Sequence, residues 1–197
     1  MLVKDKALLE SLTRKYGKDF VINEMTRGRK SKLTPSELYD MDEIPDGYFA
    51  GRKDLKEIVI PDNIIYIGNF AFEHCVNLTS VTIPDSVRTI GSWAFQECYN
   101  LTSINIPDSV TSIGDSAFRG CENLKSVTIP DSVTSIGEKA FAYCSSLISI
   151  TIPNGVTNIG DGAFWYCKNL KKIEIIGDTD IKFLNYAIPK TVKIIRK

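Results

Sequence analysis

The chain has 197 residues, of which 43% are apolar and 24% charged, the proportions of an ordinary soluble globular protein. Its formal net charge of zero excludes a general electrostatic attraction to nucleic acid or to an anionic membrane. No stretch approaches the roughly 18 consecutive apolar residues of a membrane-spanning helix, and the N-terminal segment is too charged for a secretion signal, so we expect a cytoplasmic protein without membrane insertion.

Residues 1–45 lie outside any repeat and predict a helical N-terminal extension. Apolar residues at helical spacing mark one face of a first helix, which ends at Gly17. The motif "TPSE" (Thr34–Glu37) is a capping box with Pro35 at the first helical position, so a second short helix is expected to begin there.

From residue 46 onwards the sequence repeats itself every 23 residues. Five columns keep this step through five successive units, and a fixed period between 20 and 50 residues is typical of a solenoid. The two columns expected to fill its core are Phe72, Phe95, Phe118, Phe141 and Phe164, and Cys75, Cys98, Cys121, Cys144 and Cys167. One unit has too few apolar side chains to offset its own ordering entropy, so units must stack on one another.

Within one unit the pattern predicts a strand, a turn and a return path. Residues 78–83 alternate, which points Val81 and Ile83 inward, and stacked units would join these strands into a parallel sheet on one face. Gly91 is expected to allow a tight bend. The segment "SWAFQEC" that follows it predicts a short helical turn that inserts its Phe and Cys into the core.

These columns resemble the BspA-type leucine-rich repeat, "LxxIxIPxxVxxIGxxAFxxC". The resemblance implies an α/β solenoid and a binding scaffold, in a family with many bacterial surface proteins. Serine occupies the position where common leucine-rich repeats have asparagine, so we expect no buried asparagine ladder and do not carry over the horseshoe curvature of those repeats. These serines are Ser86, Ser109 and Ser132.

Three segments are therefore expected: the extension 1–45, the solenoid 46–175 and a C-terminal cap 176–197. At the front, Phe49 and Leu55 continue their columns in a degenerate half-unit. At the back, Pro189 falls 13 residues late in its column, and the "IPKTVKII" that it begins is interpreted as a capping turn.

The sequence argues against catalysis and against a metal centre. The five cysteines lack the paired CxxC spacing of metal ligands and are interpreted as reduced core residues. His74 is the single histidine and lies in a variable column, so no catalytic triad, enzyme activity or cofactor is expected. The column Asp62, Asp85, Asp108 and Asp131 is assigned to turn hydrogen bonding, with a cation site as the alternative.

Two sets of variable residues are candidates for binding. Tyr143, Trp165 and Tyr166 should cluster near the C-terminal turns, either as a partner-binding patch or packed under the 13-residue insertion. On the strand face, an uncharged row is either a binding surface or a generic solvated sheet; it consists of Thr82, Asn105, Thr128 and Thr151.

We therefore predict a non-enzymatic scaffold that presents a rigid repeat surface to a macromolecular partner, most simply a protein. One alternative is a bacterial surface adhesin or host-interaction protein whose signal is absent from this sequence. Another is an intracellular inhibitor or adaptor that contacts a nucleoprotein through a basic segment of the extension. That segment would bind nucleic acid through Arg27, Arg29, Lys30 and Lys32.

Overall fold

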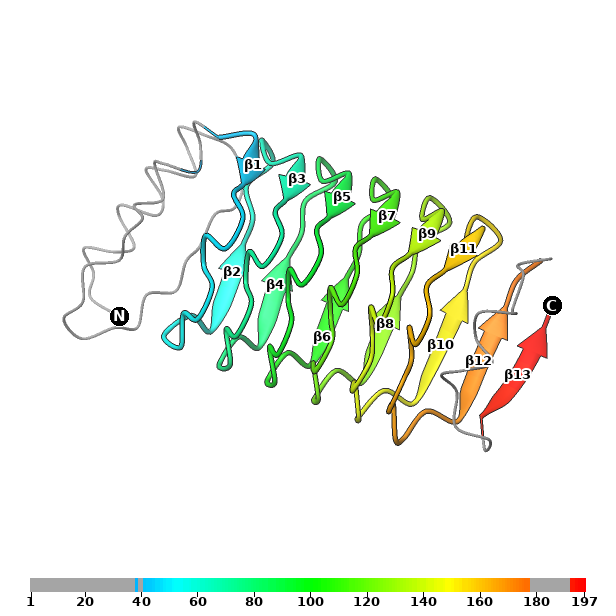
Figure 1. The fold of residues 1–197 in the computed structure, drawn as a ribbon. Helices are drawn as coiled ribbons and strands as arrows, with labels where there is room; N and C mark the ends of the chain where they lie inside the picture. The colour runs from blue at the N-terminus through cyan, green and yellow to red at the C-terminus, as the bar shows by residue number, and fades with distance from the viewer. Residues whose placement is uncertain (1–37, 39–40, 178–191) are drawn as a thin grey trace.

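The structure is a computed structural model that describes residue 38, residues 41–177 and residues 192–197. These residues form a parallel β-solenoid in which each repeat makes one coil and the coils stack along one axis (Figure 1). The predicted stack is confirmed. The predicted α/β fold class is wrong for the repeats, since residues 41–177 and 192–197 contain no α-helix. The predicted helices of the extension lie outside the described residues.

One row of strands corresponds to the predicted sheet. Its inward positions are buried and its outward positions exposed, as the alternation of Val81 with Ser80 and Thr82 predicts. Between neighbouring repeats the register is offset by 23 residues, so that Glu57 pairs with Ser80. The row is β2 (Glu57–Val59), β4 (Ser80–Thr82), β6 (Ser103–Asn105), β8 (Ser126–Thr128), β10 (Ser149–Ile152), β12 (Lys172–Ile175) and β13 (Lys193–Arg196).

A second row of two-residue strands, which the sequence did not predict, forms a continuous six-stranded parallel sheet along the other side of the stack (Figure 1). The return path of each coil supplies one strand, whose isoleucine enters the core. β1 lies before residue 46, where the repeats were expected to begin. The row is β1 (Glu43–Ile44), β3 (Tyr66–Ile67), β5 (Thr89–Ile90), β7 (Ser112–Ile113), β9 (Ser135–Ile136) and β11 (Asn158–Ile159).

The core between the two rows is a set of side-chain ladders. Six phenylalanines stack nearly parallel, with ring centroids 5.0 to 5.8 Å apart from one coil to the next. Phe49 and Leu55 are each 1% exposed, which confirms their predicted place in the first unit. Because each of the four inner rings contacts the rings of both neighbouring coils, the core is shared between coils.

Serine hydroxyls take the place of an asparagine ladder. Ser86 Oγ donates to the Ile64 carbonyl oxygen at 2.6 Å, and Ser109 and Ser132 make the equivalent bond to the coil before them at 2.6 and 2.7 Å. Each bond satisfies a backbone acceptor at the coil boundary, where an unpaired carbonyl would be costly.

The glycine column, which was expected to allow a tight bend, also lies at a close approach between the backbones of neighbouring coils. A Cβ on Gly114 would lie 2.5 Å from the Ser92 nitrogen and 2.6 Å from the Gly91 carbonyl carbon. Only a residue without a side chain allows the backbones of neighbouring coils to come this near.

The C-terminal end of the solenoid carries one strand beyond the last repeat. β13 pairs in parallel with β12 and extends the first strand row by one strand. Residues 178–191, which make up most of the expected C-terminal cap, lie outside the described residues. The cap therefore remains a prediction.

Candidate functional site on the turn face

The turns that join the second strand row to the first form one side of the solenoid, which we call the turn face. It comprises residues 45–52, 68–75, 91–98, 114–121, 137–144 and 160–167. In the third of these turns, the Phe95 amide donates to the Ala117 carbonyl of the next coil at 2.7 Å, while the Gln96 amide donates within its own turn to Trp93 at 3.0 Å. Because every second amide points to the next coil, the predicted helical turn is wrong.

This alternation places two residues of each turn in the left-handed region, Trp93 and Glu97 in the third turn with φ of 57° and 56°. Glycine takes this conformation without strain, whereas other L-residues need about 1–2 kcal/mol. The first left-handed column is Gly47, Phe70, Trp93, Ser116, Lys139 and Gly162, and the second is Gly51, His74, Glu97, Gly120, Tyr143 and Tyr166.

Four large aromatic residues occupy positions where the same fold elsewhere accepts glycine: Phe70, Trp93, Tyr143 and Tyr166. A bulky side chain at positive φ is a true conformational outlier, and such outliers concentrate at functional sites. The backbone conformation therefore makes these four residues candidates for a functional role. Sequence reasoning missed Phe70 and Trp93, although their column is as variable as that of Tyr143.

Tyr143, Trp165 and Tyr166 form a contiguous cluster, which we call the aromatic patch. The ring centroids of Tyr143 and Tyr166 are 5.2 Å apart in a stacked arrangement, and Trp165 meets both rings edge-on at 5.4 and 5.0 Å. The predicted clustering is confirmed. Trp165 is 39% and Tyr166 50% exposed, and most of the 13-residue insertion that was the alternative packing partner lies outside the described residues.

Arg119 connects the aromatic patch to the rest of the turn face. Its guanidinium carbon lies 5.1 Å from the centroid of the Tyr143 ring, within the range of a cation–π contact. Its Nη1 atom lies 3.5 Å from Glu97 Oε1. The two contacts hold the half-buried arginine in one orientation between charge and ring.

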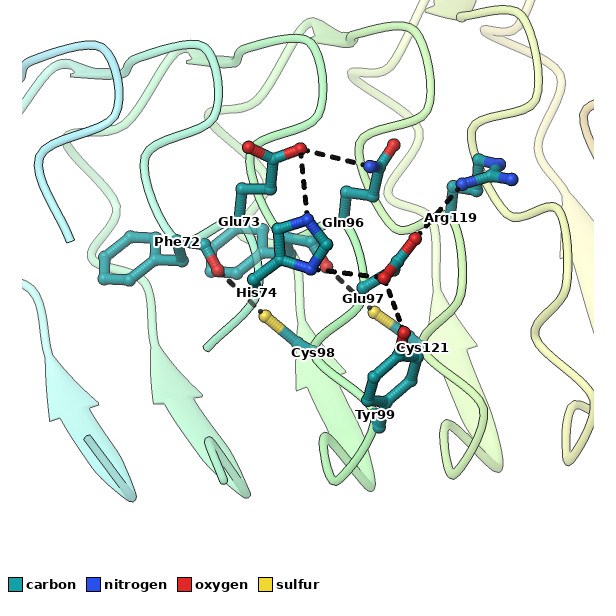
Figure 2. A network of polar contacts seen from close by, with 10 residues as sticks. Phe72, Glu73, His74, Gln96, Glu97, Cys98, Tyr99, Arg119 and Cys121 are labelled. Carbon is teal, nitrogen blue, oxygen red and sulfur yellow. Dashed lines mark hydrogen bonds and ion pairs between the residues drawn. The ribbon is translucent and has the colours of Figure 1, made fainter. Parts of the chain in front are cut away.

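Towards the N-terminal coils, the turn face carries a polar network centred on His74 and Glu97 (Figure 2). His74 Nδ1 lies 3.1 Å from Glu97 Oε2, which also accepts a 2.5 Å hydrogen bond from the Tyr99 hydroxyl. That bond to a carboxylate raises the pKa of Tyr99 to about 12. Gln96 in turn donates to Glu73 at 3.1 Å. These contacts satisfy the polar groups of the network from within the protein.

Cys98 and Cys121 lie next to this network (Figure 2), and the other cysteines continue the same buried column. All five are free and buried, which confirms their predicted place in the core. Burial is the main reason why the pKa of every thiol is raised, to about 12 for Cys75 and Cys167. Within the described residues, no group of three or more His, Cys, Asp or Glu side chains could hold a metal ion.

The strand-face candidates form a separate surface. Their side chains are exposed on the first strand row, as expected, and belong to Thr82, Asn105, Thr128 and Thr151. At its C-terminal end this row carries charged residues that form ion pairs. Glu174 Oε1 lies 2.9 Å from Lys197 Nζ and 3.0 Å from Lys172 Nζ. The two ammonium groups, Lys197 first, lower the pKa of the Glu174 carboxyl to about 2.

The basic nucleic-acid candidates cannot be placed, since Arg27, Arg29, Lys30 and Lys32 lie outside the described residues. Among the residues that the structure does describe, no helix has the length and apolar character needed to cross a bilayer.

A family model described as "BspA type Leucine rich repeat region" matches residues 42–171 and 90–194, in six copies. A solved leucine-rich repeat protein from T. pallidum is 33% identical, with a TM-score of 0.65, over 76% of this chain and 72% of that one. A solved leucine rich cell surface protein from Faecalibacterium prausnitzii A2-165 is 36% identical, with a TM-score of 0.52. That match covers 68% of this chain and 42% of the other. No curated protein matches this chain.

Proposed function

This chain belongs to the BspA-type leucine-rich repeat family, and we propose that it is a non-enzymatic scaffold that presents the aromatic patch to a protein partner. Leucine-rich repeat proteins are generally binding scaffolds, which supports the class of function. The observation that carries the choice of surface is the exposure of Trp165 and Tyr166, with Tyr166 on left-handed backbone.

The mechanism is pre-organisation. Backbone hydrogen bonds join the turn of Tyr143 to the turn of Trp165, with the Tyr143 amide 2.7 Å from the Trp165 carbonyl oxygen. The phenylalanine ladder beneath holds the same two coils together. A partner that covers the aromatic patch would therefore bury large rings without first having to order them, which lowers the entropic cost of association.

The test uses the glycine tolerance of the left-handed column. In the variant Tyr143→Gly/Tyr166→Gly both rings are removed and the backbone strain is relieved, so the fold should be retained. We expect affinity for a purified partner, identified by pull-down and mass spectrometry, to fall by about 30-fold or more in calorimetry, as for interface hot spots.

The matched control is Asn105→Ala/Thr128→Ala on the strand face, which should bind as the unaltered protein does. Loss of binding in this control, with retention in the tyrosine variant, would move the site to the strand face. A large fall in the melting temperature of the tyrosine variant would instead assign the rings to structural packing.

A surface adhesin is the second candidate function. It is supported by the F. prausnitzii relative, which is described as a cell surface protein. Labelling intact source cells with an antibody against this chain distinguishes a location at the cell surface from one in the cytoplasm. Signal on intact cells supports the adhesin, whereas signal only after permeabilisation supports an intracellular scaffold.

The nucleoprotein adaptor remains a prediction that depends on the basic segment of residues 26–32. Binding of duplex DNA or RNA that weakens steeply between low and high salt would support it, because counterions are released when phosphates are neutralised. A full-length chain that binds neither nucleic acid at low salt would contradict it.

A further inference from the structure

An open groove of about 520 Å³ crosses four successive coils of the turn face. Trp93 borders it in the first of these coils and Trp165 in the last. These are the two tryptophans of the whole chain. The groove therefore begins and ends at an indole ring, and its first ring lies outside the aromatic patch.

The hollow arises where large side chains give way to small ones. The first left-handed column changes from Trp93 to Ser116, and the column that contains Arg119 and Trp165 has Ala142 between them. Ser116 is only 6% exposed, and its side chain lines the groove. The small Ser116 next to Trp93 leaves space that the neighbouring large side chains border.

The polar lining of the groove is balanced in charge. Arg119 and Lys139 contribute two cations, and Asp115 and Glu138 contribute two anions. Gln96 adds an amide that donates and accepts. The lining therefore offers donors and acceptors in similar measure and has no net charge.

We propose that this groove binds a neutral oligosaccharide. A pyranose ring has an apolar C–H face, which packs on the electron-rich face of an aromatic ring, and hydroxyl groups at its rim, which both donate and accept hydrogen bonds. Such a ligand matches indoles at the two ends and mixed donors and acceptors between them. Concave sites with aromatic walls and a few polar groups are typical of small-ligand binding.

Two other classes of ligand fit less well. An acidic ligand would find the cations of Arg119 and Lys139 offset by the carboxylates of Asp115 and Glu138. A proline-rich peptide would also pack on indoles, but its prolines lack N–H donors and would add no hydrogen bond to the acceptors of the lining.

This inference goes beyond the proposed function, because the ligand differs and Trp93 does not belong to the aromatic patch. The first experiment presents the labelled full-length protein to an array of neutral, sialylated and sulfated oligosaccharides. A neutral oligosaccharide that binds is then titrated into the protein while tryptophan emission is recorded. Since both tryptophans line the groove, binding there should change the emission.

The decisive variant is Trp93→Gly, which removes one indole at a left-handed position where Gly47 and Gly162 occupy the same column. We expect a melting temperature equal to or above that of the unaltered protein, and at least a tenfold loss of oligosaccharide affinity in calorimetry. Trp165→Ala, which copies Ala142 of the same column, should show a similar loss and serves if the first variant does not fold. Ile148→Ala, an exposed apolar residue on the strand side, is the matched control and should bind normally.

The proposal is overturned if no neutral oligosaccharide binds, if binding is confined to sialylated or sulfated ones, or if Trp93→Gly binds as well as the unaltered protein. A decaproline peptide that changes tryptophan emission when no oligosaccharide does would also overturn it. Binding of the protein partner should be retained in Trp93→Gly, which separates this site from the aromatic patch.

Discussion

Each of the five cysteines donates its thiol proton to a phenylalanine carbonyl oxygen in the preceding coil. Cys98 Sγ, for example, lies 3.2 Å from the Phe72 oxygen, and all five distances fall between 3.1 and 3.2 Å. The thiol is therefore a structural donor that satisfies a buried carbonyl, in addition to a small apolar group. A serine would also donate at this position, but it would be more costly to bury.

The same residues predict a pH effect. Burial raises the pKa of Cys75 to about 12, above the value of about 8.5 for an exposed thiol. Because the folded state holds this proton more tightly, the stabilisation is fully present below about pH 8.5 and is lost as the pH rises through 12. We expect the native protein to resist alkylation by iodoacetamide at pH 8.5, and the unfolded protein to be modified at five sites. Rapid labelling of the native protein, measured by mass spectrometry, would contradict the buried ladder.

Residues with positive φ carry the strongest indication of function at this scale. At Tyr143 and Tyr166 the chain keeps a large ring where Gly51 and Gly120 show that glycine fits. Glycine at these positions would avoid the backbone strain and would lose only the contacts that the rings make. The proposed binding by these rings would account for their presence at these positions.

At the scale of the element, two kinds of glycine have different roles and should respond differently to substitution. At Gly114 an added Cβ would meet backbone atoms 2.5 and 2.6 Å away, which cannot move without separating two coils. At Gly120, with φ of +75°, the nearest atom is the Glu97 Cγ at 3.1 Å, part of a flexible side chain.

We expect Gly114→Ala to lower the free energy of unfolding by about 3 kcal/mol or more, as severe overpacking does. Gly120→Ala should lower it by about 1–2 kcal/mol, the strain of a left-handed alanine. Urea unfolding followed by circular dichroism measures both values. Equal losses in the two variants would show that close approach between coils is not what requires the glycine column.

At the scale of the whole molecule, stability is a sum over coils and their interfaces. Removal of residues 81–103, one full repeat, joins Ser80 to Ile104 and keeps every column in register. We expect this variant to fold and unfold cooperatively, with a lower melting temperature because one set of coil-to-coil contacts is gone.

The control for this deletion removes residues 81–92 only, which places Trp93 where a strand residue belongs and breaks the register. It should not reach the folded circular dichroism spectrum. A full-repeat deletion that is as unfolded as this control would contradict additive stacking.

The sequence by itself determined the coil. The Phe and Cys columns, the inward Val81 and Ile83 and the aromatic cluster of Tyr143, Trp165 and Tyr166 were all predicted, because burial follows the type and period of side chains. The neighbours of each side chain also follow from a strict repeat, since residues 23 positions apart must lie side by side in adjacent coils.

Only the tertiary structure decided the second sheet, the left-handed columns, the thiol hydrogen bonds and the groove between Trp93 and Trp165. Each depends on how closely one coil approaches the next and on which amides turn towards it. That spacing results from the packing of whole coils against one another, and no single unit of the sequence contains it.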